Sequence, residues 1–374
     1  MSLLDQALAP LKAHPTLKDG DRIAVAMSGG VDSSVAAALL HRGGYEVVGV
    51  SLQLFDKTSQ GSAEGRCCTL DDFQDARRVA FELGFPHYVV DHEAAFRETV
   101  IEPFIEGYLS GETPSPCIRC NQHLKFGALL DRAEAMGAAF VATGHYARIV
   151  HEGDWRMLKA SDPAKDQSYY LFHQTQATMA RTLFPLGHLR KPEVRELGRE
   201  LGLHLSEKAE SQEICFVGAQ RYDRFIESAG RAPADVNGEI RHEDGRVLGH
   251  HEGAWRYTVG QRKGLGVAFT KPLYVTRLDH ASRTVWVAED EALGGLELEA
   301  KELSWRANSP TMPFSCLARI RARGTDAPCT LTPKTDGRAL IRFQEPQRAI
   351  APGQAVVFYE GDAVLGGGWI TRHT

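Results

Sequence analysis

The chain has 374 residues, with 43 Lys and Arg against 48 Asp and Glu, which gives a formal net charge of −5. Its hydrophobic content of 43% and charged content of 24% are those of an ordinary globular protein and exclude a disordered or fibrous chain. No apolar run reaches the roughly 18 residues of a membrane-spanning helix, so we expect no membrane association. Seven cysteines in a chain of this length favour a reducing cytoplasm, with catalytic or metal-binding thiols, over a secreted disulfide framework.

The first half of the chain alternates strand and helix signals. Short apolar runs predict strands at 22–27, 47–52, 87–91 and 139–143, and helical spacing predicts helices at 33–41, 73–83 and 126–136. This order predicts an α/β fold in which a parallel sheet carries helices on both faces.

The pattern changes after about residue 215. Short alternating runs and turn pairs such as Asp244-Gly245 and Gly361-Asp362 predict hairpins, and the last part is expected to form an all-β barrel. We therefore expect an α/β domain at 1–216, a small central domain at 217–285 and a β-barrel at 286–374. Residues 301–374 carry ten Lys and Arg against six acids, so the last domain suits a polyanionic partner or is simply a basic solvated surface.

The strongest local motif is Ser28-Gly-Gly-Val-Asp-Ser-Ser34, which follows the first predicted strand and opens the first predicted helix. Small residues let backbone N–H groups approach an anion, and a helix N-terminus adds donors and a positive dipole end. Asp32 is the candidate ligand for a Mg²⁺ ion bound to phosphates. The alternative is a plain glycine turn with a helix cap, but the whole string resembles the pyrophosphate loop of the ATP pyrophosphatases.

A second motif is Cys117-Ile-Arg-Cys120, with Cys215 about 95 residues further on. Two cysteines at this spacing are typical of a catalytic thiol or a metal site, and a purely structural pair is the third option. Pro114 and Pro116 predict an exposed, extended loop around them. Of the other thiols, Cys67 and Cys68 are interpreted as non-catalytic, and Cys316 and Cys329 as buried residues of β segments.

Six longer blocks resemble, in chain order, those of bacterial tRNA-specific 2-thiouridylases. They are Pro114-Ser-Pro-Cys-Ile-Arg-Cys-Asn121, Ala142-Thr-Gly-His-Tyr-Ala-Arg148, Lys165-Asp-Gln-Ser-Tyr-Tyr-Leu171, Ser211-Gln-Glu-Ile-Cys-Phe216, Thr258-Val-Gly-Gln-Arg-Lys-Gly-Leu-Gly266 and Pro352-Gly-Gln-Ala-Val-Val-Phe-Tyr359. The resemblance covers the chain from about residue 20 to its end. It implies an enzyme that activates the wobble uridine of tRNA with ATP and replaces its 2-oxygen by sulfur.

The resemblance also implies roles for individual residues. Cys120 matches the family's nucleophile, and Cys215 matches the cysteine that receives a persulfide sulfur from a relay protein fed by a cysteine desulfurase. The ATP site would be lined by Ala26, Met27, Ser28, Gly29, Gly30, Val31, Asp32, Ser33, Leu52 and Gly144. The target base and the tRNA would be contacted by Pro116, Cys117, His145, Lys165, Asp166, Gln167, Arg321 and Gln354.

Three positions depart from the family pattern. Leu52 replaces a common Met, and both are apolar side chains that can pack on a base. Ala322 follows Arg321 where an aromatic residue is usual, which removes a stacking contact. Cys117 stands where the best-known members have Asp.

Cys117 suggests an alternative to the persulfide route. Cys117, Cys120 and Cys215 could ligate a 4Fe-4S cluster with one open iron, and the persulfide route is preferred because the surrounding blocks match persulfide-type members. A small-molecule ligase of the pyrophosphatase class would need neither the cysteine pair nor the barrel, and a non-enzymatic metal- or RNA-binding module would not need the phosphate loop.

Overall fold

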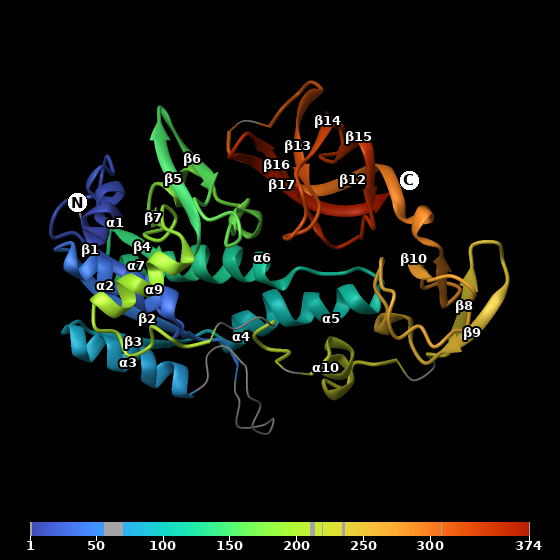
Figure 1. Cartoon of the computed structure of the whole chain (residues 1–374), viewed down its shortest axis with the longest axis horizontal. Coiled ribbons are helices and arrows are strands. Elements are labelled where there is room, and N and C mark those ends of the chain that lie inside the picture. Colours follow the sequence, from blue (N-terminus) through green and yellow to red (C-terminus); the bar gives the residue numbers. More distant parts are fainter. Residues whose placement is uncertain are drawn as a thin grey trace. The chain divides into compact units, whose positions relative to one another are not determined.

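The computed structural model describes residues 2–55, 70–209, 214–218, 220–233, 236–307 and 309–373. The interpretation of Cys67 and Cys68 lies outside these residues. The chain divides into two compact units (Figure 1). Unit 1 comprises Met1–Val100, Cys117–Ala219 and Asp362–Val364, and unit 2 comprises Ile101–Pro116, Gln220–Gly361 and Leu365–Thr374. No described helix is both long and apolar enough to span a membrane.

Unit 1 is built on a five-stranded parallel sheet in the order β3-β2-β1-β4-β7. Its strands are β1 (Arg22–Ala26), β2 (Glu46–Gln53), β3 (His87–Asp91), β4 (Phe140–Thr143) and β7 (Thr182–Leu183). The predicted parallel α/β sheet is therefore confirmed. Ile23, Ala24 and Val25 are all fully buried, although successive side chains of a strand point to opposite faces, so both faces of β1 are covered.

Helices and one hairpin complete unit 1 around this sheet. The helices are α1 (Leu3–Lys12), α2 (Val31–Arg42), α3 (Leu70–Leu83), α4 (Glu93–Phe96), α6 (Pro116–Cys120), α7 (Leu129–Ala135), α8 (Gln176–Met179) and α9 (Lys191–Glu200). Gly84, with φ of +82°, follows α3 directly and suits the left-handed position at a helix C-terminus. The hairpin of β5 (Ala147–Glu152) and β6 (Asp154–Lys159) was not among the predicted elements.

The predicted extended loop around the paired cysteines is wrong. Pro116 is the first residue of α6, which continues through a π-helical segment, η2 (Asn121–Ala128), into α7. Proline suits the first turn of a helix because its φ is already helical and its missing N–H group would have no partner there. Pro116 therefore starts the helix that carries Cys117 and Cys120.

Unit 2 begins with α5 (Glu102–Leu109) and contains α10 (Tyr222–Ser228) and a four-stranded sheet in the order β10-β11-β8-β9. Its strands are β8 (Gly238–His242), β9 (Val247–His251), β10 (Tyr274–Asp279) and β11 (Thr284–Ala288). The hairpin predicted at Asp244-Gly245 is the turn between β8 and β9, which pair in antiparallel fashion.

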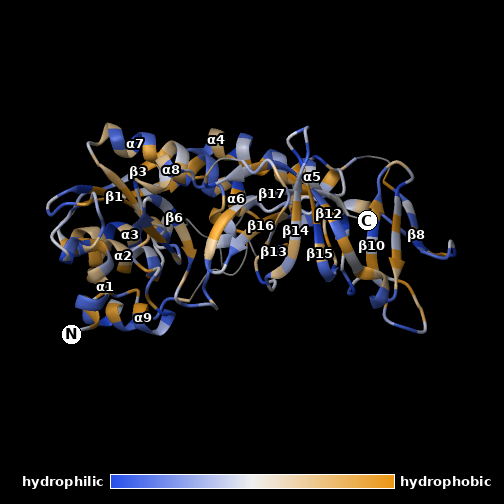
Figure 2. Cartoon of the chain, turned by 90° about the horizontal axis from the view of Figure 1, so that it is seen from above, coloured by the Kyte–Doolittle hydropathy of each residue, from blue (hydrophilic) through white to orange (hydrophobic). Residues whose placement is uncertain are grey.

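The last part of unit 2 is the predicted barrel. Its strands run in the order β12-β15-β14-β13-β16-β17, and pairing of β12 with β17 closes it. They are β12 (Gly294–Trp305), β13 (Phe314–Arg319), β14 (Ala327–Pro333), β15 (Ala339–Arg348), β16 (Ala355–Glu360) and β17 (Ala363–His373). Buried and exposed residues alternate along β14, and Figure 2 shows the mixed polarity of these strands. Cys329 lies in the barrel core as predicted, with its Sγ 3.6 Å from that of the half-buried Cys316.

We expect Leu331→Ala to destabilise the barrel by about 2–5 kcal/mol, because Leu331 is fully buried in its core and truncation leaves a cavity. Thermal unfolding of the full chain, followed by near-ultraviolet circular dichroism, measures the effect. The matched control is Leu296→Ala in strand β12 of the same barrel, where the side chain is 46% exposed and the expected change is within about 0.5 kcal/mol. Equal effects of the two variants would contradict this picture of the core.

Candidate nucleotide cavity and cysteine helix

The Ser28-Gly29-Gly30 loop joins β1 directly to α2. Gly29 has a φ of +72°, and a Cβ atom there would overlap the carbonyl oxygen of Asp72. The backbone N–H of Ser28 donates to Ser33 Oγ at 3.1 Å, which holds the loop against the first turn of α2. Gly30 is the N-cap of α2, and no described side chain caps the helix there, so the first-turn N–H groups can donate to an anion.

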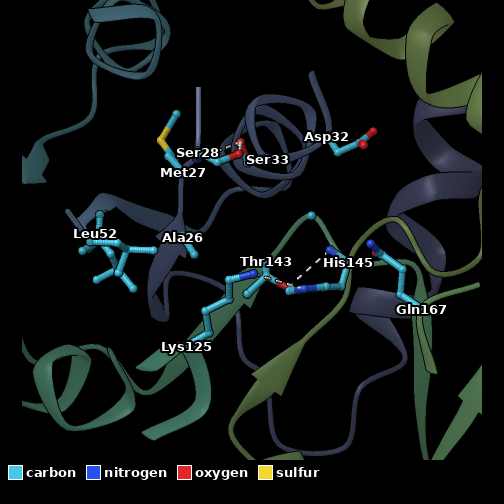
Figure 3. Close-up of a pocket in the computed structure, with 13 residues that line it drawn as sticks. Ala26, Met27, Ser28, Asp32, Ser33, Leu52, Lys125, Thr143, His145 and Gln167 are labelled. Carbon is cyan, nitrogen blue, oxygen red and sulfur yellow. Dashed lines mark hydrogen bonds between the residues drawn. The ribbon is translucent and has the colours of Figure 1, made fainter. Parts of the chain in front are cut away.

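A cavity of about 220 Å³ opens at this end of the sheet (Figure 3). Of the predicted ATP residues, those that line it are Ala26, Met27, Ser28, Asp32, Ser33, Leu52 and Gly144. Gly29, Gly30 and Val31 belong to the loop and helix start but do not line the cavity. His145 and Gln167, which were predicted as tRNA contacts, do line it, and so do Val50, Leu54, Lys125 and Thr143, which were not predicted.

The carboxylate of Asp32 is held by two groups from distant parts of the chain. Lys191 Nζ lies 2.7 Å from Asp32 Oδ1, and the Tyr146 hydroxyl donates to the same oxygen at 2.8 Å. Lys191 is buried at the first position of α9. Sequence reasoning missed this partner because 159 residues separate it from Asp32 and no local pattern marks it.

A second lysine fixes the loop from the other side. Lys208 Nζ donates to the carbonyl oxygen of Gly29 at 2.9 Å and to the carboxylates of Asp72 and Asp75 at 2.8 and 2.6 Å. Burial opposes the charge of Lys208, but the two carboxylates outweigh it and raise the pKa of the ammonium group. The loop is thus tied to the first part of α3.

His145 is a neutral ring in the cavity wall. Its Nδ1 lies 2.7 Å from Thr143 Oγ1, and its Nε2 lies 3.5 Å from Lys125 Nζ. Burial and the charge of Lys125 hold the pKa of His145 well below its usual value, so the ring is uncharged near pH 7. Because Lys125 can only donate, Nε2 accepts and the ring proton sits on Nδ1, facing Thr143.

The predicted tRNA block 165–167 is a half-buried segment beside this wall. Asp166 Oδ1 accepts the N–H groups of Ala160 and Ser168, and its Oδ2 accepts the Ser168 hydroxyl. Gln167 Oε1 accepts the N–H of Tyr146 at 2.9 Å. Asp166 and Gln167 therefore order their own segment.

The paired cysteines lie in different surroundings on α6. Cys117 is exposed, Cys120 is 8% exposed, and Pro116 is buried. Burial raises the pKa of the Cys120 thiol, and the positive charge of Lys125 partly offsets that rise.

Cys215 belongs to the same unit as this helix. It is half-buried and precedes Phe216, whose ring packs edge-on against Phe96 at a centroid distance of 5.6 Å. Over the described parts of the chain, which include all three cysteines, no three His, Cys, Asp or Glu side chains converge as a metal-ligand set. The arrangement described here thus does not assemble Cys117, Cys120 and Cys215 as cluster ligands.

The two remaining predicted tRNA residues are in unit 2. Gln354 is half-buried, and its Nε2 donates to the carbonyl oxygen of Thr113 at 2.7 Å. Arg321 is exposed on the barrel, and its guanidinium donates to the carbonyl oxygen of Arg348 at 2.7 Å.

These features define an α/β protein with a phosphate-binding loop, a cysteine-bearing helix and an appended β-barrel. Profiles of three domain families match the chain: a "tRNA methyl transferase HUP domain" at residues 21–219, a "tRNA methyl transferase PRC-barrel domain" at 225–289 and an "aminomethyltransferase beta-barrel domain" at 296–370.

Proteins named as tRNA-specific 2-thiouridylases match nearly the whole chain. Those from Geobacter metallireducens and Magnetococcus marinus are each 51% identical, over 95% and 93% of this chain and 98% of their own lengths. The chain belongs to the family of tRNA-specific 2-thiouridylases. Among solved structures, a 4-thiouridine synthetase–RNA complex with bound ATP aligns with a TM-score of only 0.36 and 18% identity, over 56% of this chain and 50% of that one.

We expect iodoacetamide to alkylate Cys117 much faster than Cys120 near pH 8, because Cys117 is exposed whereas Cys120 is buried with a raised pKa. Peptide mapping by mass spectrometry at successive times measures both rates in one sample. In mild urea, below the unfolding transition, Cys117 should still be alkylated faster than Cys120. Faster labelling of Cys120 than of Cys117 would contradict the burial described here.

Proposed function

We propose that this chain uses ATP to adenylate the 2-oxygen of the wobble uridine in tRNA and then replaces that oxygen with sulfur from a cysteine persulfide. Its family makes it a tRNA-uridine 2-sulfurtransferase. The observation that carries the proposal is that one compact unit contains both the uncapped phosphate loop and the cysteines at 117, 120 and 215. We propose the domain boundaries 1–216, 217–285 and 286–374 for the catalytic, central and tRNA-contacting parts.

The cavity supports a binding mode for ATP. Val50, Leu52 and Leu54 offer an apolar wall for the base, and the N-terminus of α2 offers donors to the phosphates. Gly144 would sit beside the adenosine. A Cβ atom at Gly144 would lie 2.8 Å from the backbone of Asp32 and Ser33, so this glycine also lets the cavity wall approach α2.

Asp32 fits a role in holding Mg²⁺. In the described part of the chain its hydrogen bonds all run to Oδ1, which leaves Oδ2 as the ligand oxygen. Mg²⁺ is typically bound by one or two carboxylates together with substrate phosphates, and it neutralises phosphate charge when bound. Because Lys191 already balances the charge of Asp32, we infer that the metal enters with the nucleotide rather than alone.

The activation step explains why ATP and sulfur chemistry share one chain. A carbonyl oxygen is a poor leaving group. When the uridine O2 attacks the α-phosphorus, pyrophosphate leaves, and the O2 atom becomes part of an adenylate that can depart as AMP. The neutral His145 and its neighbours in the cavity wall would face this step.

The sulfur step would then use two thiols. The terminal sulfur of a Cys215 persulfide attacks C2 of the activated base, and AMP leaves with the former O2 atom. The Cys120 thiolate next attacks the Cys215 sulfur, which breaks the sulfur–sulfur bond and releases the 2-thiouridine. The product disulfide between Cys120 and Cys215 takes two electrons from a dithiol reductant before the next cycle.

The macromolecular partners follow from charge and chemistry. tRNA would be contacted at Pro116, Cys117, His145, Lys165, Asp166, Gln167, Arg321 and Gln354. The exposed Arg321 on the basic C-terminal part suits a phosphate contact. We propose that a sulfur-relay protein fed by a cysteine desulfurase supplies the persulfide. A 4Fe-4S route through Cys117, Cys120 and Cys215 is the second candidate, because thiolates are the usual ligands of such clusters. Among the described residues these three thiols do not converge on one point.

We expect Asp32→Ala to reduce formation of AMP and pyrophosphate by at least about a hundredfold, because it removes the carboxylate that would hold Mg²⁺ against the phosphates and takes a charge partner from the buried Lys191. Thin-layer chromatography of α-labelled ATP with tRNA present measures the nucleotide products. Asp19→Ala, at an exposed turn, is the matched control and should be unaffected. Wild-type release of ADP and phosphate would refute the assignment.

We expect protein purified without oxygen to contain no iron or acid-labile sulfide and to thiolate tRNA with a persulfide donor. Cys117→Asp should remain active, since Cys117 would not carry sulfur, whereas Cys120→Ser should lose turnover. Iron and sulfide assays, with mass spectrometry of tRNA nucleosides, measure these outcomes. About four irons per chain and an inactive Cys117→Asp would instead establish the cluster route.

A further inference from the structure

We propose that Lys125 is a catalytic residue of the ATP step, whose ammonium group binds the α-phosphate and stabilises the negative charge that develops there during adenylation. The inference rests on the proposed function. It assigns a role to a side chain that the sequence motifs do not mark.

The inference rests on which charged side chains line the cavity and which of them are already paired. Among the described residues that line the cavity, Asp32 and Lys125 are the charged ones. Asp32 is already paired with Lys191, and the neighbouring His145 is neutral. The loop itself contains no lysine. Lys125 is therefore the cation that the cavity wall offers to a strongly anionic phosphate chain.

The present contact of Lys125 is weak enough to be exchanged. Its Nζ lies 3.5 Å from His145 Nε2, which is the outer limit for a hydrogen bond. Figure 3 shows the Lys125 side chain extending toward Thr143 and His145, which line the same cavity. A phosphate oxygen would give a shorter, charge-assisted bond than the neutral ring does.

The position of Lys125 in the chain links it to the reacting centre. It lies in the π-helical segment that directly follows Cys120, and π-helical turns are common at functional sites. Adenylation requires the uridine O2 to meet the α-phosphorus, and the later sulfur step acts on C2 of the same base. A cation that holds the α-phosphate from the Cys120 helix would bring both reactions to one place.

The test compares Lys125→Met and Lys125→Arg with the wild type. We expect Lys125→Met to lower the rate of AMP formation by about a hundredfold or more while ATP binding weakens far less, because the contact strengthens in the transition state. Lys125→Arg should recover part of the rate, since it keeps the charge but changes its shape. Lys18→Met, at an exposed position before β1, is the matched control.

A phosphorothioate readout separates contact from mere structural damage. Sulfur in place of a non-bridging oxygen on the α-phosphorus should slow AMP formation by the wild type. The ratio of the rate with ATP to the rate with this α-thio analogue should fall toward one in Lys125→Met. A structural lesion would slow both nucleotides equally and leave the ratio unchanged, which would overturn the inference, as would normal AMP formation in Lys125→Met. Absence of AMP from the wild type itself would instead refute the proposed function.

Discussion

The nucleotide cavity depends on two close backbone approaches that only glycine permits. At Gly29 the loop turns through a positive φ against the carbonyl oxygen of Asp72, and at Gly144 the end of β4 reaches the backbone of Asp32 and Ser33. Any Cβ atom at either position would push apart the segments that form the cavity. These contacts place the open N-terminus of α2 beside the carboxyl end of the sheet, where parallel α/β folds bind ligands.

Around these glycines, partly buried ion pairs hold the loop in place. Lys191 holds Asp32, and Lys208 holds Gly29 together with Asp72 and Asp75. Burying such charges costs solvation free energy, which close pairing offsets. Among the described residues, no side chain caps the first turn of α2, and Asp32, Asp72 and Asp75 are each paired with a lysine. A preorganised site of this kind requires little rearrangement when an anion arrives.

The cysteine helix shows the opposite arrangement, in which the proposed nucleophile is protected. Cys120 is buried and its thiol is held neutral, although Lys125 favours the thiolate. Protection of the thiol suits an enzyme whose sulfur chemistry should begin only after the base has been activated. Lys125 is near both the cavity and Cys120, so this helix would connect the two proposed half-reactions.

The sequence alone determined the parallel sheet and the β-rich C-terminal part, because each follows from a local pattern of residues. It also marked the Ser28 loop and the cysteine pair as candidate sites, whereas the roles of the thiols came from the family resemblance. Periodicity placed β1 to β4, and the small residues of the Ser28 motif identified the anion site. The extended loop predicted around Pro116 was wrong, because proline suits a loop and the first turn of a helix equally well. The tertiary structure decided the partners that come from far along the chain: Lys191 and Tyr146 at Asp32, and Lys125 opposite His145. The spacing of residues along the chain does not predict such contacts, because they form only when separate strands and helices pack around one sheet.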